Sequence, residues 1–216
     1  GGGDLRGLLV QRFDRVVEGR TVRRLHQEDF AQALGLGPQL KYERNGTVGR
    51  RFCAETIRAV LDQTATPGPA RQAFLEITVA NLLLGNTDNH AKNHALLYRG
   101  PRPDLAPVYD VAPVLIDDQV LHQLSFNIGA AAMTDDITAE DMRAFILALG
   151  FPRATAPLMQ RLRDIVQTTV ALIPELNGPA RKRIGDAIAE QARWLASAVG
   201  ADVDIPARDL VMINRP

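Results

Sequence analysis

The feature that most constrains this chain is a polar segment, residues 85–93, which separates two apolar runs. The apolar runs lie at 80–84 and 95–98, and the segment between them reads GNTDNHAKN. Buried elements on both sides would hold such a loop still, and a loop on a rigid scaffold carries chemistry more often than packing. We therefore predict that the functional site is built around this loop.

Three polar side chains stand in a defined order in and after the loop. Asp88 and Asn93 lie within it, and Asp110 follows a further apolar run at 105–108. An Asp, an Asn five positions later and a second Asp after a β-hairpin form the order of polar groups in a protein-kinase catalytic centre. There the first Asp orients the attacking hydroxyl, while the Asn and the second Asp hold the Mg²⁺ that bridges the nucleotide phosphates. The order favours phosphoryl transfer, with Lys92 placed to offset charge on the γ-phosphate.

Two other interpretations of these residues stay open. Asp88 could simply cap a turn, since Asp favours such positions, and Asp110 could cap a helix. His90 and His94, four positions apart and near Asp88, could instead form the metal site of a hydrolase. A His pair at this spacing converges on a metal only from a helix, and the residues before His90 do not favour one. We therefore expect His90 to brace the loop through hydrogen bonds to the backbone.

The composition narrows the class of protein. The 25 basic and 25 acidic residues balance, which argues against a nucleic-acid binder that works by bulk electrostatics. Cys53 is the only cysteine, so no internal disulfide can form, and this fits a reducing, cytoplasmic compartment. No secretory signal is visible, and no apolar run approaches the roughly 20 residues of a membrane helix. We expect a protein that does not act at a membrane.

The rest of the sequence predicts an α+β chain that is mostly helical, folded as one domain with a small sheet beside the site. Apolar periodicity and end signals favour helices near 30–34, 50–63, 70–84, 138–149, 158–173 and 179–195. The strands expected are a short one at 8–15 and a β-hairpin at 94–98 and 105–108, and 119–128 could be a strand or an extended segment. We divide the chain into a flexible lead-in at 1–7, a lobe at 8–200 and a tail at 201–216.

The other titratable or bulky side chains are expected to be structural. His26 and His122 should lie at the surface or its boundary, and Cys53 should pack as a small hydrophobe on a helix. Trp194 should lie in the core or at an interface. The acidic run 27–29 should occupy the first turn of the helix that follows it, where carboxylates interact favourably with the helix dipole.

The loop sequence closely resembles the catalytic loop of HipA-type serine/threonine kinases, the toxin halves of bacterial type II toxin–antitoxin pairs. Shorter blocks resemble the same family in the same order, namely RFDR at 12–15, RLHQED at 24–29, LKYE at 40–43 and VYDVAP at 108–113. The resemblance extends from residue 8 to about residue 200. It implies the C-terminal catalytic lobe of a protein-kinase-like fold that uses ATP and Mg²⁺.

The resemblance assigns roles residue by residue. Asp88 becomes the catalytic base, with Asn93 and Asp110 as the metal ligands. The segment 10–13 becomes the hinge strand, in which backbone groups of Gln11 and Phe13 would bind adenine. Asp14 would lie near the ribose, and we group His90 with these nucleotide-binding residues. Lys92 stays with Asp88 as a catalytic residue.

The resemblance also implies partners. Family members phosphorylate proteins, including an aminoacyl-tRNA synthetase, and they bind an antitoxin that itself binds DNA, so nucleic acid would be reached only indirectly. The family has an N-terminal lobe that supplies a phosphate-covering loop and an ATP-contacting Lys, whereas no Lys occurs here before Lys41. We therefore expect a lobe that is inactive alone and needs an N-terminal lobe in cis or in trans. The alternative is a non-catalytic remnant that serves as a binding module for an antitoxin or another protein.

Overall fold

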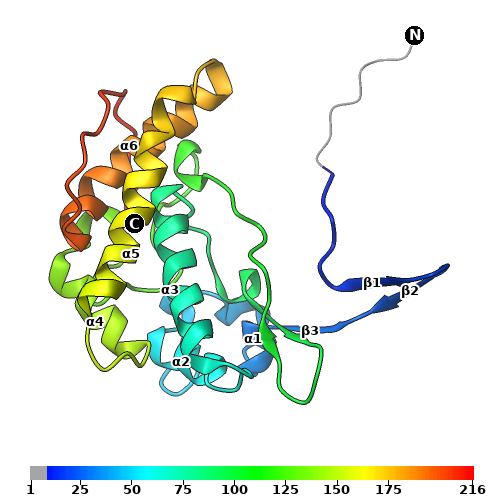
Figure 1. The fold of residues 1–216 in the computed structure, drawn as a ribbon. Helices are drawn as coiled ribbons and strands as arrows, with labels where there is room; N and C mark the ends of the chain where they lie inside the picture. The colour runs from blue at the N-terminus through cyan, green and yellow to red at the C-terminus, as the bar shows by residue number, and fades with distance from the viewer. Residues whose placement is uncertain (1–8) are drawn as a thin grey trace, which may run out of the picture.

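The computed structural model describes residues 9–216, except for the side chain of Ala180. Three long helices form the body of the molecule and pack on one another: α3 (Pro67–Leu83), α5 (Ala156–Ala171) and α6 (Pro179–Val199) (Figure 1). The shorter helices are α1 (Phe30–Ala33), α2 (Ala54–Leu61) and α4 (Ala139–Ala148). The predicted α+β, mostly helical class is confirmed. None of the described helices combines the length and apolar character needed to cross a membrane.

The helix ends follow the local signals in the sequence. Thr138 caps α4 by accepting a hydrogen bond from the backbone N–H of Asp141 at 3.2 Å, and Pro179 occupies the first turn of α6, so these helices begin close to the starts predicted at 138 and 179. α3 starts at Pro67, three residues before the predicted start. A proline is tolerated there because the first backbone N–H groups of a helix have no intrahelical partner. α2 starts at Ala54 rather than near residue 50, because Thr56 and Cys53 close a capping box at its N-terminus.

The small sheet beside the loop has the antiparallel order β3 (His26–Asp29), β4 (Ala95–Tyr98), β5 (Asp104–Leu105). The predicted hairpin is therefore confirmed, with a shorter second strand. The acidic run 27–29 was wrongly predicted as a first helical turn, since it pairs with β4 instead. Only Asp29 serves the helix, as the N-cap of α1 in a capping box with Gln32.

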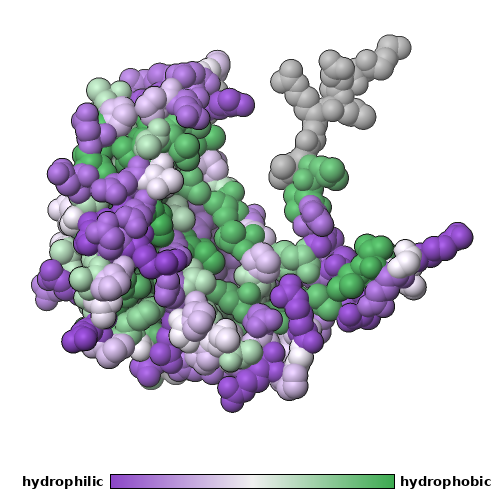
Figure 2. All heavy atoms as spheres, viewed as in Figure 1, coloured by the Kyte–Doolittle hydropathy of each residue, from purple (hydrophilic) through white to green (hydrophobic). Residues whose placement is uncertain are grey.

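The predicted strand at 8–15 is wrong in the described part of the chain. Residues 9–14 form no strand, and β1 (Arg15–Glu18) pairs with β2 (Thr21–Arg24) in a hairpin that projects from the body (Figure 1). We call residues 9–24 the arm. Figure 2 shows apolar surface along the arm, and its exposed apolar side chains are Leu9, Val10, Val17 and Val22. Residues 9–14 pair with no sheet in the described structure, so the side chains of Leu9 and Val10 stay exposed. The predicted lead-in, 1–7, lies outside the described residues.

A cluster of aromatic side chains forms the core below the loop. The rings of Phe30 and Phe74 stack at 6.0 Å, and that of Phe126 meets Phe52 edge-on at 5.4 Å and Phe145 in a stack at 5.9 Å. All five rings are buried, and they come from segments far apart in the chain. This core fixes the sheet against the helices.

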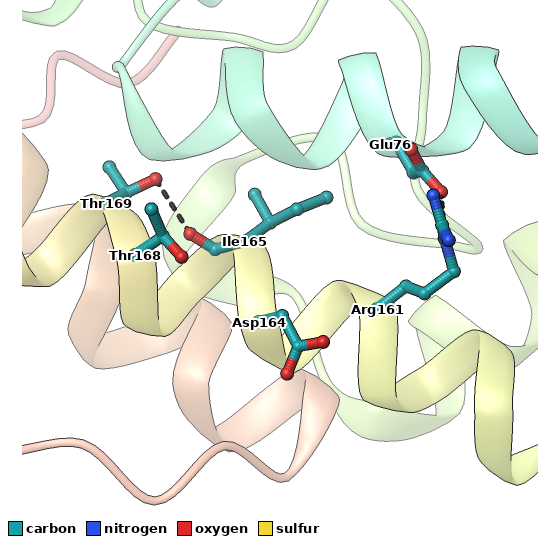
Figure 3. Close-up of a pocket in the computed structure, with 6 residues that line it drawn as sticks. All are labelled: Glu76, Arg161, Asp164, Ile165, Thr168 and Thr169. Carbon is teal, nitrogen blue, oxygen red and sulfur yellow. Dashed lines mark hydrogen bonds and ion pairs between the residues drawn. The ribbon is translucent and has the colours of Figure 1, made fainter.

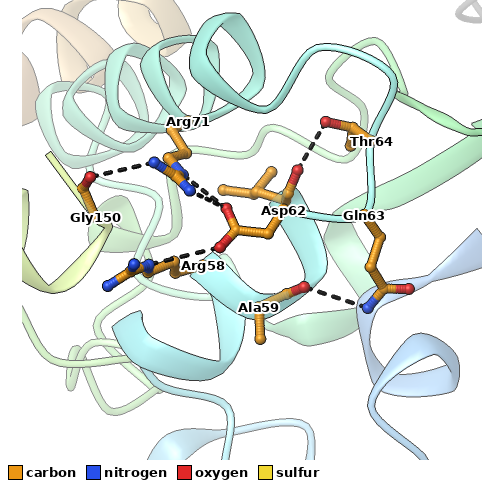
Figure 4. Close-up of polar contacts among 8 residues, drawn as sticks. Arg58, Ala59, Asp62, Gln63, Thr64, Arg71 and Gly150 are labelled. Atoms are coloured by element: carbon orange, nitrogen blue, oxygen red, sulfur yellow. Dashed lines mark hydrogen bonds and ion pairs between the residues drawn. The ribbon is translucent and has the colours of Figure 1, made fainter.

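An arginine–aspartate network ties α2 to α3 at the edge of the body (Figure 4). The carboxylate of Asp62, at the end of α2, binds Arg71 of α3 and lies 3.6 Å from Arg58 of its own helix. Arg71 also donates to the carbonyl of Gly150, just beyond α4, at 3.2 Å. These contacts lie outside the loop and are structural.

The C-terminal tail has no helix or strand, yet it is fastened to the body. Its Asn214 exchanges backbone and side-chain hydrogen bonds with His122, which is fully buried. The prediction of a surface or boundary position for His122 was therefore wrong, because the tail covers it. Residues 119–127 are irregular rather than a strand. His26 is exposed, and Trp194 is 39% exposed, so Trp194 lies at the surface and not in the core.

Candidate active site

The loop leaves α3 through a glycine that no other residue could replace without strain. Gly85 has φ +69°, and the backbone N–H of Asn86 donates to the carbonyl of Asn81 at 2.8 Å, which closes the helix. A Cβ at Gly85 would stand 2.7 Å from Cβ of Leu115. The backbone N–H of Leu115 donates to the Gly85 carbonyl at 2.9 Å, so the two segments must approach closely. The loop therefore begins in a fixed direction.

Hydrogen bonds connect polar groups within the loop and tie the loop to the end of α3. The side-chain amide of Asn93 donates to the carbonyl of Asp88 at 3.0 Å, and the backbone N–H of His90 donates to the same oxygen at 2.9 Å. The side-chain amide of Asn86 donates to Oδ1 of Asn81 at 2.7 Å. Asn86, His90 and Asn93 are buried, and buried polar groups that are hydrogen-bonded hold a backbone rigid. The loop carries Asp88 on a preformed support.

His94 anchors the end of the loop in the aromatic core. Its buried ring lies 4.7 Å from that of Phe74 and 5.5 Å from that of Phe30. Burial lowers the pKa of His94 to about 3, although a hydrogen bond to the backbone of Asn89 acts in the opposite direction, so the ring is neutral. No group of three or more His, Cys, Asp and Glu in residues 9–216 is arranged to hold a metal ion. The hydrolase interpretation built on Asp88, His90 and His94 has no support in this geometry.

Asp88 is half-exposed and is oriented by a tyrosine that the spacing argument did not identify. The Tyr42 hydroxyl donates to Oδ1 of Asp88 at 2.6 Å, and Oδ2 lies 3.9 Å from Nε2 of His90. The Tyr42 ring meets the His90 ring edge-on at 5.3 Å. The Arg44 guanidinium lies 4.0 Å from the centre of the Tyr42 ring. Burial and the bond to Asp88 raise the pKa of Tyr42 to about 12, so its hydroxyl remains a donor. Its one sequence signal is its place in the LKYE block.

Asp110 stands in an unusual backbone conformation beside the loop. It has φ +57°, and no other described residue except glycine has a positive φ. Its carbonyl accepts a hydrogen bond from the side-chain amide of Asn86 at 3.5 Å. Burial lowers the pKa of His90, while the negative charges of Asp88 and Asp110 act in the opposite direction. Strained residues of this kind often mark functional sites.

The arm meets the loop through an aromatic pair. The Phe13 ring lies 5.9 Å from that of Tyr109, whose hydroxyl donates to the carbonyl of Lys92 at 2.8 Å, and the Lys92 side chain is exposed. Within residues 9–216, the backbone groups of Gln11 and Phe13 make no hydrogen bond to other backbone groups. The carboxylate of Asp14 forms ion pairs with Arg12 at 2.7 Å and with Arg15 at 2.5 Å. These contacts lower the pKa of Asp14 to about 2, and the hydrogen bond from Arg12 has the largest effect.

A hollow of about 400 Å³ opens beside Asp88. It is lined by Tyr42, Arg44, Thr87, Asp88, Val114, Val120, Leu121 and Gln123. A second hollow of similar volume, about 410 Å³, lies between α3 and α5 (Figure 3). Its main feature is the ion pair of Glu76 and Arg161 at 2.6 Å, and none of its lining residues belongs to the loop. We take the hollow at Asp88 as the candidate active site.

Comparison with known proteins gives a consistent set of relatives. Residues 2–174 match the family described as HipA-like C-terminal domain. Y4mE of Sinorhizobium fredii, which is named as a kinase, is 31% identical over 168 residues, covering 77% of this chain and 39% of that protein. The serine/threonine-protein kinase toxin HipA of Shewanella oneidensis is 29% identical over 189 residues, covering 81% of this chain and 44% of that protein.

A solved structure shares the fold. HipA of Shewanella oneidensis MR-1, in a complex with HipB and its operator DNA, superposes with a TM-score of 0.71 at 24% identity and covers 89% of this chain. The superposition covers 50% of the HipA chain in that complex. In the sequence comparisons, the match covers less than half the length of Y4mE and of the kinase toxin HipA. The predicted family and the predicted kinase-like C-terminal lobe are therefore confirmed, while the likeness to the solved structure concerns the fold alone.

Proposed function

Because this chain belongs to the HipA-like C-terminal domain family, we propose that it is the catalytic lobe of a serine/threonine protein kinase that transfers the γ-phosphate of ATP to a protein hydroxyl. One observation carries the proposal. Asp88 is half-exposed at a hollow, and its carboxylate is oriented by Tyr42 on a loop in which the side chains of Asn86 and Asn93 are buried and hydrogen-bonded. Phosphoryl transfer asks the protein mainly for positioning and charge compensation, which this support supplies.

In this proposal Asp88 is the catalytic base. Tyr42 occupies Oδ1 with its hydroxyl proton, which leaves Oδ2 to accept the hydrogen bond of a serine or threonine hydroxyl. A hydrogen bond of this kind orients the attacking oxygen in line with the phosphorus. Lys92, whose side chain is exposed on the same loop, offsets charge on the γ-phosphate.

Asn93 and Asp110 would hold Mg²⁺, and the residues present fit that ion. Amide and carboxylate oxygens are the ligands that Mg²⁺ prefers, with water and phosphate completing the shell. Nε2 of His90 lies 3.9 Å from Oδ2 of Asp88, and Nδ1 of the same ring is buried without a hydrogen-bond partner in the described residues, so the loop has a free polar atom for a further group. When bound, the ion would neutralise charge on the β- and γ-phosphates.

The arm would hold the nucleoside. Backbone groups of Gln11 and Phe13 would bind adenine, as hinge groups do, and Asp14 would lie near the ribose. The carboxylate of Asp14 already binds Arg12 and Arg15, so it would act there together with these arginines. His90 would complete the nucleotide side of the loop.

The other partners are proposed from the relatives. An N-terminal lobe, in cis or in trans, would supply the phosphate-covering loop and a lysine, because this chain spans less than half the length of the curated relatives named above. An antitoxin would bind the whole kinase, and nucleic acid would be reached only through it, as in the complex of HipA, HipB and operator DNA. The substrate would be a cytoplasmic protein, such as an aminoacyl-tRNA synthetase.

The test joins an N-terminal lobe of a relative to this chain and measures Mg²⁺-dependent transfer of labelled phosphate to protein. We expect Asp88→Asn to reduce transfer at least about a hundredfold, since general acid–base groups contribute about 10²–10⁴ in rate. Asp204→Asn, an exposed carboxylate of the tail, is the matched control and should leave transfer unchanged. Intact transfer in Asp88→Asn would refute the assignment. Antitoxin binding without any transfer would favour the alternative, a non-catalytic binding module.

A further inference from the structure

The hollow at Asp88 has two walls of different chemistry. One wall is aliphatic, formed by Val114, Val120 and Leu121, of which Val120 is 37% and Leu121 53% exposed. The other wall carries Arg44, whose guanidinium lies 4.0 Å from the centre of the Tyr42 ring. An aliphatic surface, a guanidinium and a carboxylate that line the same hollow can contact a peptide at three points.

Contacts within the described residues hold the Arg44 side chain in place, but none of them is an ion pair. The Tyr42 ring supports the guanidinium face at 4.0 Å, and Nη1 donates to the carbonyl of Leu124 at 3.3 Å. No carboxylate in residues 9–216 forms an ion pair with Arg44, whereas most other pairs in the molecule involve arginine. Arginine offers a planar set of five N–H donors that matches a carboxylate. Its remaining donors are therefore available to a ligand in the hollow.

We propose that this hollow binds an acceptor peptide that carries, beside its serine or threonine, an aliphatic side chain and a carboxylate, and that Arg44 determines the preference for the carboxylate. The inference rests on the proposed function, because it places the acceptor hydroxyl at Asp88. The aliphatic side chain packs on Val120 and Leu121, and the carboxylate pairs with Arg44. A pocket of this size with an apolar wall and a few converging polar groups is typical of a ligand site.

The C-terminal tail holds the aliphatic wall in position. The side-chain amide of Asn214 donates to the carbonyls of Asp118 at 2.7 Å and of Val120 at 3.0 Å. The backbone N–H of Asn214 donates to Nδ1 of His122 at 3.0 Å, and that of His122 donates to the Asn214 carbonyl at 3.0 Å. Leu121 lies between Val120 and His122, which are both hydrogen-bonded to Asn214. Asn214 is therefore a positioning residue for the aliphatic wall, and within residues 9–216 none of its hydrogen bonds goes to Arg44.

The test measures binding of short fluorescein-labelled peptides to the 216-residue chain by fluorescence anisotropy, without ATP. Each peptide contains one serine, one leucine and one charged residue, either glutamate or lysine, placed before the serine in one pair and after it in another. We expect the glutamate peptide of at least one pair to bind about tenfold more tightly than its lysine partner, because unlike charges attract and like charges repel across an interface.

Variants separate the two walls. Arg44→Glu should reverse the charge preference, and Arg44→Lys should retain its direction. Arg143→Glu, an exposed arginine of α4, is the matched control and should bind like the original chain. Asn214→Ala should weaken binding of all leucine peptides and leave the ratio of glutamate to lysine peptides unchanged. Circular dichroism of each variant checks the fold, and Arg44→Gln, which should abolish the preference, replaces Arg44→Glu if that variant unfolds.

Several outcomes would overturn the inference. Equal binding of glutamate and lysine peptides in both pairs would do so, as would a preference that survives Arg44→Glu or Arg44→Gln. A change of charge ratio in Asn214→Ala would overturn the division into two walls. Because binding is measured without nucleotide, the inference can fail while the kinase with an N-terminal lobe still transfers phosphate. Conversely, the predicted preference without any transfer would leave the peptide site standing and remove the proposed function.

Discussion

The loop at 85–93 and the arm at 9–24 belong to the two halves of one proposed site, yet the chain supports them very differently. In the loop Asn86, His90 and Asn93 are no more than 6% exposed, although all three are polar. In the arm Leu9 is 98% exposed and Val17 72%, although both are apolar (Figure 2). The half of the site that would orient the acceptor and the metal is thus built by this chain's own core. The half that would hold the nucleoside projects from it and presents surface of the kind that an N-terminal lobe would cover.

The strongest test of this contrast removes a core ring beneath the loop. Phe74→Ala deletes a fully buried side chain that contacts Phe30, Phe126 and His94. We expect a loss of about 3–5 kcal/mol in the free energy of unfolding, measured by urea denaturation, because the cavity left behind cannot collapse completely. A loss below about 1 kcal/mol would mean that the loop does not depend on this core.

A backbone change at the start of the loop should cost less. Gly85→Ala forces a Cβ into a left-handed conformation and against Leu115, and strain of this kind costs about 1–3 kcal/mol. Gly68→Ala, in the first turn of α3, is the matched control because no atom lies within 4 Å of its added Cβ. The free energy of unfolding of the control should differ from that of the original chain by less than about 0.5 kcal/mol. Equal effects of the two changes would contradict the proposed fixed exit of the loop.

Acid should loosen the loop through His94. Burial lowers the pKa of His94 from 6.5 to about 3, so the folded state disfavours the proton that the unfolded state accepts. This contribution to stability is complete above pH 6.5 and is lost as the pH falls toward 3, with a slope of up to about 1.4 kcal/mol per pH unit. Unfolding by urea at a series of pH values measures the slope. His94→Phe should flatten it within this window, whereas His26→Gln, at an exposed histidine, should not.

The sequence predicted those parts of the molecule whose causes are local. The ends of α4 and α6 depend on Thr138, Asp141 and Pro179 within a few residues, and the β4–β5 hairpin depends on its own turn. The order of Asp88, Asn93 and Asp110 along the chain led to the family, while their catalytic and metal-binding roles stay predictions.

What the sequence did not reveal depends on partners far along the chain. Tyr42 meets Asp88 across 46 positions, and His122 is buried by Asn214 across 92. Neither partner is visible in a local pattern, so Tyr42 was missed and His122 was placed at the surface. The left-handed backbone of Asp110 has no sequence signature either, because Asp is common in ordinary turns. The strand wrongly predicted at 8–15 has the apolar alternation of a strand but no sheet in the described structure to pair with.

The smallest expected effect lies in the arm. Val17 faces Val22 across the β1–β2 hairpin, and both side chains are mostly exposed, so Val17→Ser should change the free energy of unfolding by less than about 0.5 kcal/mol. Leu97→Ser, at a fully buried position in β4, is the contrasting variant and should destabilise the chain strongly because it buries a hydroxyl in an apolar site. A loss above about 1 kcal/mol in Val17→Ser would show that the arm is packed in the isolated chain. If the apolar side chains of the arm instead contact an N-terminal lobe, Val17→Ser should weaken the binding of such a lobe added in trans, because that contact forms only in the assembled kinase.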